Sequence, residues 1–300
     1  MVTSLSILIP VFNQDVTAMV HTLLAQCIRL SISYEIRIYD DASEDQFRQL
    51  NRPLAGQAGV VYEELPNNIG RSSIRNRLAF DAQYEHLLFL DNDCLPVSFN
   101  FLFNYLVEAQ LSEVVIGGVA YVATKPEKPF RLHWKYGRLR GAKSATQRQQ
   151  QPYNDVFLCN ALIKRAVFYK FPLRESLKKY GHEDTVFAQH LQENNISVKH
   201  INNPVVHLGL EETTVLLLKT EQAVQNLAQL YAEGEQVEPI RIMQAYNMLQ
   251  NWRLARPYQL VFATIERVVK QNLASGYPNL MLYDLYRLFL LSKLLQNKKG

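Results

Sequence analysis

The sequence lacks the features that mark membrane-spanning and secreted proteins. It has no stretch of 18 consecutive apolar residues, so no membrane span is expected. Met1 to Pro10 has neither a basic region nor a long apolar stretch, which predicts that there is no signal peptide. The three cysteines, Cys27, Cys94 and Cys159, are odd in number and have no metal-type spacing. They predict reduced thiols in a cytoplasmic protein.

Glycine-rich phosphate-binding loops are also missing. No Gly-x-Gly-x-x-Gly follows the first apolar run, where Pro10-Val11-Phe12-Asn13 stands instead, so a dinucleotide-binding dehydrogenase is disfavoured. The loops expected of a P-loop enzyme and of a sugar-nucleotide pyrophosphorylase are absent as well. The formal net charge of +4 is too small for a dedicated nucleic-acid-binding protein, so no nucleic acid is expected as a partner.

Short apolar runs alternate with helical patterns over the first 120 of the 300 residues. The expected strands cover residues 5–9, 34–39, 59–63, 87–90 and 114–121, and the expected helices cover 15–29, 44–50, 71–82 and 96–110. This alternation predicts an α/β fold with a mainly parallel, doubly wound sheet. In such a sheet, ligands bind outside the carboxyl ends of the strands.

Polar and aromatic side chains follow several of these strands. Asp91 and Asp93 come directly after the apolar run His86–Leu90, and side chains at i and i+2 of an extended chain point the same way. Two hard oxygen ligands held in this manner suit Mg²⁺ or Mn²⁺ together with a bound phosphate. The other side chains expected on this rim are Phe12, Asp40, Asp41 and Asn68.

The pattern changes after residue 121. Six cations follow with no acidic residue among them: Arg131, Lys135, Arg138, Arg140, Lys143 and Arg148. This segment is interpreted either as a solvated basic loop or as a mobile lid that closes on an anionic substrate or a lipid phosphate. Further on, residues 157–171 and 183–193 are expected to be helical, and 196–201 to form a strand.

Four long amphipathic patterns, at 213–231, 239–252, 257–272 and 278–296, predict a helical tail. We therefore expect one domain at residues 1–210 and a C-terminal helical region at 211–300. The leucine-rich face of the last pattern is expected to pack on the main domain or on a second copy, which would form a homodimer. The alternative is peripheral docking on the inner face of an anionic membrane.

Five segments, in this order, resemble the family 2 glycosyltransferases, which are inverting enzymes of the GT-A fold that use nucleotide-activated sugars. They are Pro10-Val11-Phe12-Asn13, Asp40-Asp41-Ala42-Ser43-Glu44-Asp45, Asn68-Ile69-Gly70 with Arg75-Asn76, Asp91-Asn92-Asp93, and Gly181-His182-Glu183-Asp184. The resemblance covers roughly residues 4–208. Two features depart from the family: Phe157-Leu158-Cys159-Asn160 stands where Gly or Ser is frequent, and the helical tail has no counterpart.

The resemblance implies a nucleotide-sugar site. Phe12 offers a flat face on which a base can stack, or else it packs at the strand end. Asp41, or Asp40 beside it, would accept the imide N–H of uracil, and the alternative is that it caps the next helix. Arg71 and Arg75 share a helical face, near the phosphates or the base or else in solvent. The donor-binding residues implied are Pro10, Phe12, Asn13, Asp40, Asp41, Asn68, Arg71, Arg75, Asp91 and Asn92.

The resemblance also implies a metal and a catalytic base. Asp93 would bind the metal directly, with His207 as a further ligand and Asp91 at the metal-bound water, and these mixed ligands favour Mn²⁺ over Mg²⁺. A structural role is the alternative for His207. Asp184 would take the proton from the acceptor hydroxyl and Glu183 would orient the acceptor, unless both are ordinary acids of a first helical turn.

The sequence thus predicts a cytoplasmic, metal-dependent, inverting glycosyltransferase of polysaccharide or glycoconjugate biosynthesis. The expected donor is a UDP-sugar, and the expected acceptor is a glycan or a lipid-linked sugar. The alternative is a non-catalytic scaffold or binding subunit with the GT-A fold. The presence of Asp91, Asp93, Glu183, Asp184 and His207 together argues against that alternative, because a scaffold needs none of them.

Overall fold

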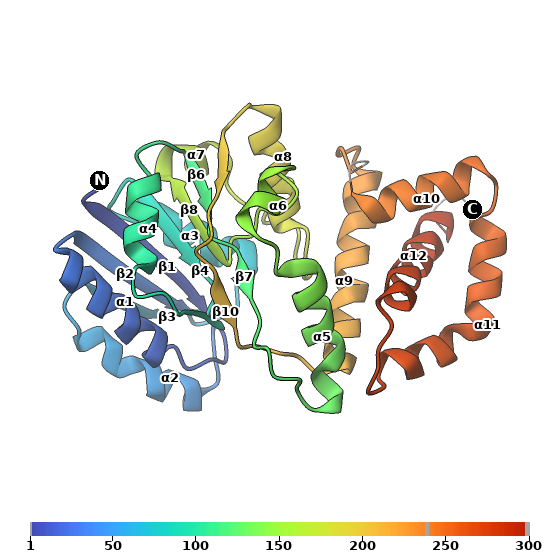
Figure 1. Ribbon diagram of the computed structural model, residues 1–300, viewed down its shortest axis with the longest axis horizontal. Coiled ribbons are helices and arrows are strands. Elements are labelled where there is room, and N and C mark those ends of the chain that lie inside the picture. The colour runs from blue at the N-terminus through green and yellow to red at the C-terminus, as the bar shows by residue number, and fades with distance from the viewer. Residues whose placement is uncertain (1, 238–239, 298–300) are drawn as a thin grey trace. The chain divides into compact units, whose positions relative to one another are not determined.

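The computed structural model describes residues 2–237 and 240–297, and the chain forms two compact units. The first unit contains Met1–Val122, Gly141–Lys178 and Glu183–Gly209, and the second contains Ala123–Arg140, Lys179–His182 and Leu210–Gly300 (Figure 1). The sequence predicts a division after residue 210. The two short internal segments of the second unit are not part of that prediction.

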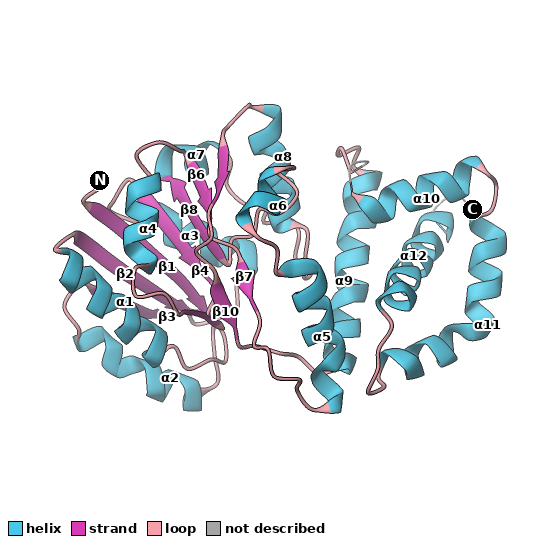
Figure 2. Cartoon of the chain, viewed as in Figure 1, coloured by secondary structure: helices cyan, strands magenta, loops and turns pink. Residues whose placement is uncertain are grey.

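The first unit is built on a seven-stranded sheet in the order β3-β2-β1-β4-β8-β6-β9 (Figure 2). β1, β2, β3 and β4 run parallel, β8 is antiparallel to both β4 and β6, and β9 is parallel to β6. The strands are Ser4–Val11, Ser33–Asp40, Val60–Glu64, His86–Leu90, Val114–Ile116, Asn160–Lys164 and Val198–His200 for β1, β2, β3, β4, β6, β8 and β9. The predicted α/β class with a mainly parallel sheet is confirmed.

One predicted helix is wrong. Residues 157–171 contain strand β8 (Asn160–Lys164) before helix α7 (Arg165–Lys170) begins. Strand β8 lies between β4 and β6, and its first four residues are buried. A strand buried on both faces reads as an unbroken apolar run, and periodicity cannot distinguish such a run from a buried helix.

Alternating side chains divide the core between the two faces of the sheet. Ile7 and Leu88 belong to one buried cluster, with side chains from α1 (Thr17–Leu30) and α4 (Phe101–Glu108). Their strand neighbours Leu8 and Phe89 belong to the other, with side chains from α3 (Arg71–Phe80), α7 and α8 (Glu183–Glu193). Helices thus cover both faces, and the carboxyl ends of the strands remain for the site. The short helix α2 (Asp45–Asn51) and the 3₁₀ turn Arg52–Gly56 connect β2 to β3.

A small second sheet completes the first unit. Its order is β5-β10-β7, with β5 at Cys94–Pro96, β7 at Val119–Ala120 and β10 at Val205–His207. The antiparallel register pairs His207 with Cys94, and the Leu208 N–H donates to the Asp93 carbonyl oxygen over 2.8 Å. This pairing carries His207 to the turn that follows β4, although more than 100 residues separate the two in the sequence.

The basic segment is largely helical, so its interpretation as a loop is wrong, while its interpretation as a mobile lid stays a prediction. It forms α5 (Arg131–Tyr136), a π turn at Gly137–Gly141 and α6 (Ala145–Gln149), after the 3₁₀ turn Lys128–Phe130. All six cations have partners: Arg131 with Gly276 O, Lys135 with Pro278 O, Arg138 with Ala123 O, Arg140 with Asp284, Lys143 with Asp155 and Arg148 with Ile201 O. These cations therefore contact carbonyl oxygens and carboxylates of the protein itself.

The second unit is helical, as the tail patterns predict. It contains α9 (Thr213–Ala232), α10 (Arg241–Asn251), α11 (Ala255–Leu273) and α12 (Leu280–Asn297). Pro239, the expected start of the second tail helix, lies outside the described residues. Much of the apolar face of α12 lies in the core of its own unit: Tyr286 and Leu291 are fully buried. Within the described ranges, no helix is long and apolar enough to cross a membrane.

Candidate active site

The ends of β1 and β2 are fastened to each other through their turns. The Asn13 N–H donates to Ser43 Oγ over 2.8 Å, and the Glu44 N–H donates to Asn13 Oδ1 over 2.8 Å. Asn13 has a φ of 49°, in the left-handed region that Asn tolerates better than most residues. The turn leaves the Phe12 side chain 50% exposed at the strand end. An exposed ring on a fixed turn suits a stacking platform, which remains a prediction.

The two acids after β2 are enclosed by backbone. Asp40 is fully buried, and Asp41 accepts hydrogen bonds from the Ile69 N–H (2.7 Å) and the Gly70 N–H (3.1 Å). Burial raises the pKa of Asp41, and the two backbone donors act in the opposite direction. The Asn68 amide donates to the Asp41 carbonyl oxygen over 3.1 Å. Asp41 therefore fixes the turn before α3, and its predicted contact with uracil stays a prediction.

Asp91 lies in a network of charged side chains. Its carboxylate forms an ion pair with Arg75, and Arg71 Nη2 is 3.8 Å from its second oxygen. Arg71 also donates from Nε to Glu183 Oε1 over 2.9 Å. Burial alone would raise the pKa of Asp91, but the guanidinium groups of Arg75 and Arg71 outweigh it and lower that pKa. The structure thus brings α3, the β4 turn and α8 together at one edge.

The predicted metal ligands are only partly brought together. Asp93 Oδ2 lies 3.5 Å from His207 Nε2, whereas Asp91, expected to complete the set, faces the arginines. Among residues 2–237 and 240–297, no three His, Cys, Asp or Glu side chains form a group that could hold a metal ion. A carboxylate oxygen facing an imidazole nitrogen is nevertheless a donor pair that fits Mn²⁺.

Two residues that sequence reasoning missed shape the surroundings of this pair. A Cβ atom on Gly209 would overlap the Asp93 carboxylate, so only glycine leaves that side chain its place. The Tyr121 ring stacks on the His207 ring, with centroids 5.4 Å apart. The spacing His207-Leu208-Gly209 could have suggested the glycine. Nothing in the sequence indicates the tyrosine, because its position depends on the pairing of β7 with β10.

Glu183 and Asp184, the first residues of α8, differ in electrostatic environment. Burial, together with the negative charge of Glu183, raises the pKa of Asp184 to about 7. For Glu183, the positive charges of Arg71 and Arg75 outweigh burial, and its pKa is lowered. The Leu158 N–H donates to Asp184 Oδ2 over 3.2 Å and orients this carboxylate. One acid therefore stays ionised, while its neighbour exchanges a proton near neutral pH.

The segment that departs from the family pattern is part of the framework. Asn160 is buried; it accepts from the Tyr105 hydroxyl over 2.7 Å and donates to Gly118 O and Asn203 O. The carbonyl oxygen of Cys159 accepts from the Asp91 N–H over 3.2 Å. These two residues hold the turn after β4 against β8.

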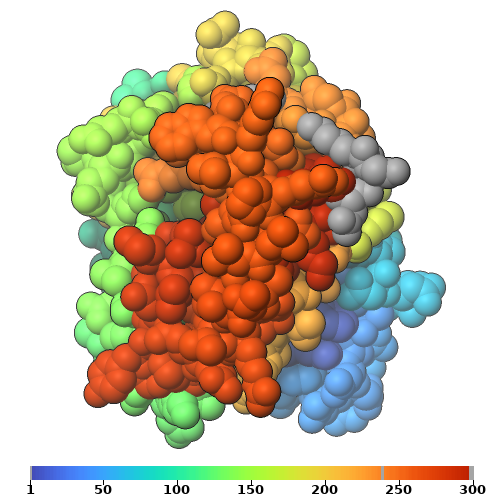
Figure 3. Space-filling view, turned by 90° about the vertical axis from the view of Figure 1, so that its right-hand side faces the viewer, coloured from blue at the N-terminus to red at the C-terminus, as the bar shows by residue number. Residues whose placement is uncertain are grey.

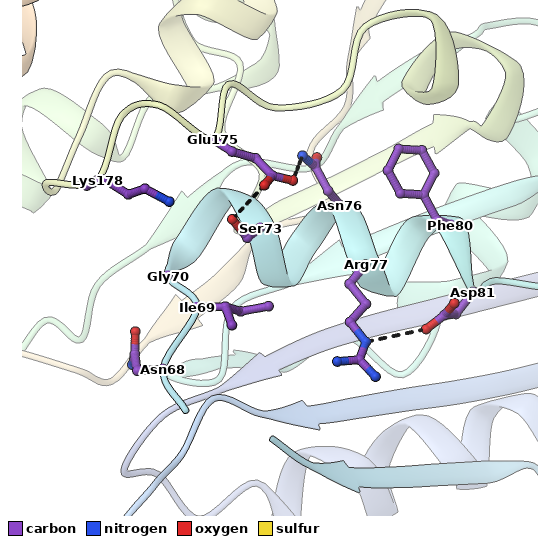
Figure 4. Close-up of a pocket in the computed structure, with 10 residues that line it drawn as sticks. All are labelled: Asn68, Ile69, Gly70, Ser73, Asn76, Arg77, Phe80, Asp81, Glu175 and Lys178. Carbon is purple, nitrogen blue, oxygen red and sulfur yellow. Dashed lines mark hydrogen bonds and ion pairs between the residues drawn. The ribbon is translucent and has the colours of Figure 1, made fainter. Parts of the chain in front are cut away.

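A polar groove runs along the other side of α3 (Figure 4). It starts at the turn Asn68–Gly70, and Glu175 forms part of its wall by accepting hydrogen bonds from Ser73 Oγ (3.0 Å) and Asn76 Nδ2 (2.8 Å). Phe80 lines it as well and is 49% exposed. The groove shares the Asn68–Gly70 turn with the site, but none of the carboxylates of the β4 turn or α8 lines it.

The sequence profile of Glycosyl transferase family 2 matches residues 6–171, which is more than half of the chain. The chain belongs to this glycosyltransferase family. The predicted family and enzyme class are thereby confirmed. A comparison with curated protein sequences finds no match.

Solved structures of glycosyltransferases share the fold. The mannosyltransferase PcManGT from Pyrobaculum calidifontis, in complex with GDP-Man and Mn²⁺, is 16% identical with a TM-score of 0.61, and the match covers 98% of this chain and 86% of that one. S. aureus TarS 1–349 is 16% identical with a TM-score of 0.52, covering 99% and 91%. TarS 1–349 in complex with UDP-GlcNAc is 14% identical with a TM-score of 0.51, covering 99% and 91%. At identities this low, the matches show a shared fold alone.

Proposed function

We propose that this enzyme moves a sugar from a nucleotide-sugar, with UDP as the expected nucleotide, to a hydroxyl of a glycan or lipid-linked acceptor, with inversion at the anomeric carbon. Its place would be the cytoplasmic assembly of a polysaccharide or glycoconjugate. The observation that carries the proposal is geometric: Arg71 donates to Glu183 over 2.9 Å and lies 3.8 Å from Asp91, so the pair Glu183 and Asp184 lies beside the turn after β4. The pKa values of the two acids also move in opposite directions, an arrangement that is common in acid–base catalysis.

In this proposal Asp184 acts as the base. The acceptor oxygen attacks the anomeric carbon and passes its proton to the Asp184 carboxylate, while the bond to the diphosphate oxygen breaks on the opposite face. Asp184 then returns the proton to water. Glu183 is ionised and hydrogen-bonded to Arg71. It would orient the acceptor hydroxyl by accepting a hydrogen bond.

The donor would lie across the edge formed by the β1, β2 and β4 turns. Stacking of the base on Phe12 would contribute about 1–3 kcal/mol. The Asn92 amide donates to the Phe12 carbonyl oxygen over 3.4 Å, which links the platform to the turn that carries Asp93. Pro10, one residue before the end of β1, would form the start of this surface.

Asp93 and His207 would hold Mn²⁺ or Mg²⁺. A bound divalent ion would offset the negative charge that grows on the leaving diphosphate. Two observations support this part of the proposal: the facing oxygen and nitrogen atoms of the two side chains, and the space that Gly209 leaves for the carboxylate. The titles of the similar structures name both GDP-Man and UDP-GlcNAc, so the nucleotide has to be determined by experiment.

A screen of UDP-, GDP- and dTDP-sugars for slow hydrolysis in the presence of Mn²⁺ tests the proposal. We expect one nucleotide class to release its diphosphate, and we expect the transferred sugar to have the anomeric configuration opposite to the donor's, as measured by NMR. If no donor releases a nucleotide diphosphate and none raises the melting temperature, the scaffold alternative is supported instead.

A further inference from the structure

The second unit exposes an apolar surface that the fold leaves uncovered. Helices α10 and α11 and the turn between them expose large apolar side chains to solvent: Met248, Trp252, Leu254, Leu260, Val261, Ile265 and Val268. Trp252 is 69% exposed, Leu260 71%, and Val261 and Val268 are each 64% exposed. Figure 3 shows this face of the second unit, with α10 and α11 in orange. Large apolar side chains exposed on successive turns of one helix mark an interaction site more often than singly scattered ones do.

The two faces of α11 are sharply different. Phe262, Val269 and Leu273 are buried in the core of the unit, with Phe262 stacked on Phe289 at 4.8 Å between ring centroids. Val261 and Val268, seven residues apart, lie on the same exposed stripe with Ile265 between them. The helix is therefore apolar on two sides, and its own unit covers only one of them.

Basic side chains border the exposed stripe. Arg253, Arg256 and Arg267 are all exposed, and none of the three has an ion-pair partner in the part of the chain that the structure describes. Arg256 and Arg267 lie eleven residues apart, which is about three helical turns, so they share one side of α11. Lys270 is paired with Glu266 over 2.7 Å.

The segment that carries this surface is itself positively charged. Residues 241–273 contain five basic residues and one acidic residue, which gives a net charge of +4. The entire chain also has a formal net charge of +4, so the rest of the sequence contains 27 basic and 27 acidic residues. The surface is thus apolar and cationic together.

We propose that this α10–α11 surface, defined by the seven apolar residues above with Arg253, Arg256 and Arg267, docks on an anionic lipid bilayer. Apolar side chains at the acyl boundary, flanked by arginines at the level of the lipid phosphates, are the pattern of an interfacial helix. A two-fold contact with a second copy would bring two segments that each carry a net charge of +4 into one interface, and this like charge opposes the contact. The helix that docks is then α11, and the final helix α12 packs against its buried face.

Vesicle flotation of the full chain tests the proposal without any nucleotide-sugar, so its failure is separate from a failure of the proposed catalysis. We expect at least about tenfold tighter binding to phosphatidylcholine vesicles with roughly one third phosphatidylglycerol than to pure phosphatidylcholine, with the difference reduced at high salt. The double variant Val261→Ser with Val268→Ser should weaken binding about tenfold or more. Arg256→Gln with Arg267→Gln should weaken it and flatten the salt dependence.

The matched control is Ile28→Ser with Leu111→Ser, which removes two apolar side chains of the first unit that are 68% and 82% exposed. This variant should bind vesicles like the unchanged protein, and all variants should keep its melting temperature. Absence of binding to anionic vesicles, or binding that the α11 variants leave unchanged, overturns the proposal. Self-association in sedimentation that Val261→Ser with Val268→Ser abolishes would also overturn it, since a second copy would then occupy the surface.

Discussion

Two turns at the edge of the sheet both carry acidic residues, but they use them differently. After β2, the carboxylate of Asp41 is bonded to the backbone N–H groups of Ile69 and Gly70. After β4, Asp91 and Asp93 face side chains instead, an arginine pair and a histidine. Backbone partners make a carboxylate part of the framework, whereas side-chain partners can change rotamer when a ligand arrives. The comparison separates a turn fixed by backbone hydrogen bonds from a turn whose carboxylates contact side chains, and we expect the ligand to bind at the second turn.

The largest effect on the transfer rate is expected from a change outside both turns, at the proposed base Asp184. Asp184→Asn should lower the transfer rate about 10²–10⁴-fold, since general base catalysis contributes in that range, while donor affinity stays unchanged. The variant should melt at the same or a higher temperature, because it removes a buried carboxylate beside the like charge of Glu183.

Glu193→Gln is the matched control, since Glu193 is an exposed acid at the other end of α8. It should leave turnover and melting unchanged. Near-normal turnover in Asp184→Asn would show that another group takes the proton.

Asp93→Ala tests whether the turn after β4 binds the metal ion. Loss of the carboxylate opposite His207 should weaken Mn²⁺-dependent UDP binding about 10–100-fold in calorimetric titration, with little change in melting temperature without ligand. Asp45→Ala, which removes an exposed carboxylate whose side chain is 64% accessible, is the control. Equal Mn²⁺-dependent affinity in Asp93→Ala and Asp45→Ala would contradict the ligand role.

The pH dependence follows from the raised pKa of Asp184. A base has to be ionised to accept a proton, so kcat/KM should fall as the pH drops through about 7 and should level off above it. Below that point the decline should approach tenfold per pH unit. A profile that is flat between pH values of about 5 and 8 would exclude Asp184 as the group that titrates.

Asp41→Ala tests the framework turn and should give the opposite result to Asp93→Ala. Removing this carboxylate leaves the Ile69 and Gly70 N–H groups without their acceptor, which should cost about 1–3 kcal/mol of the free energy of unfolding. Thermal denaturation measures the loss. Asp41→Asn keeps one acceptor oxygen and should lose less. If Asp41→Ala kept its melting temperature but lost UDP affinity, Asp41 would be a binding residue and the two turns would not differ as described.

The sequence was sufficient to predict those strands that are apolar runs ending at a polar turn. Leu5–Ile9 and Leu87–Leu90 are such runs, and β1 and β4 occupy these positions. The rule that parallel strands end together predicted Asp40, Asp41 and Asp91 at one edge, whereas Arg75 and Glu183 were expected there from the family resemblance. Helix α8 was placed by its first-turn acids.

What sequence reasoning missed depends on contacts between distant segments. Strand β8 is stabilised by pairing on both sides, so its five residues carry no periodic signal of their own. The ion pairs of Asp91 with arginines one turn apart on α3 could not be distinguished from metal binding, because both need the same carboxylate. The partners of Arg131 and Lys135 are carbonyl oxygens of residues 276 and 278, which no local pattern indicates.

Calorimetric titration of UDP and GDP into the unchanged protein, with Mn²⁺ and then with a chelator, tests the central claim most directly. A nucleoside diphosphate held through Asp93, His207 and a divalent ion should bind in Mn²⁺ and lose most of its affinity when the ion is removed. Equal affinity for the same nucleotide in the chelator would contradict a metal–diphosphate site at this edge of the sheet.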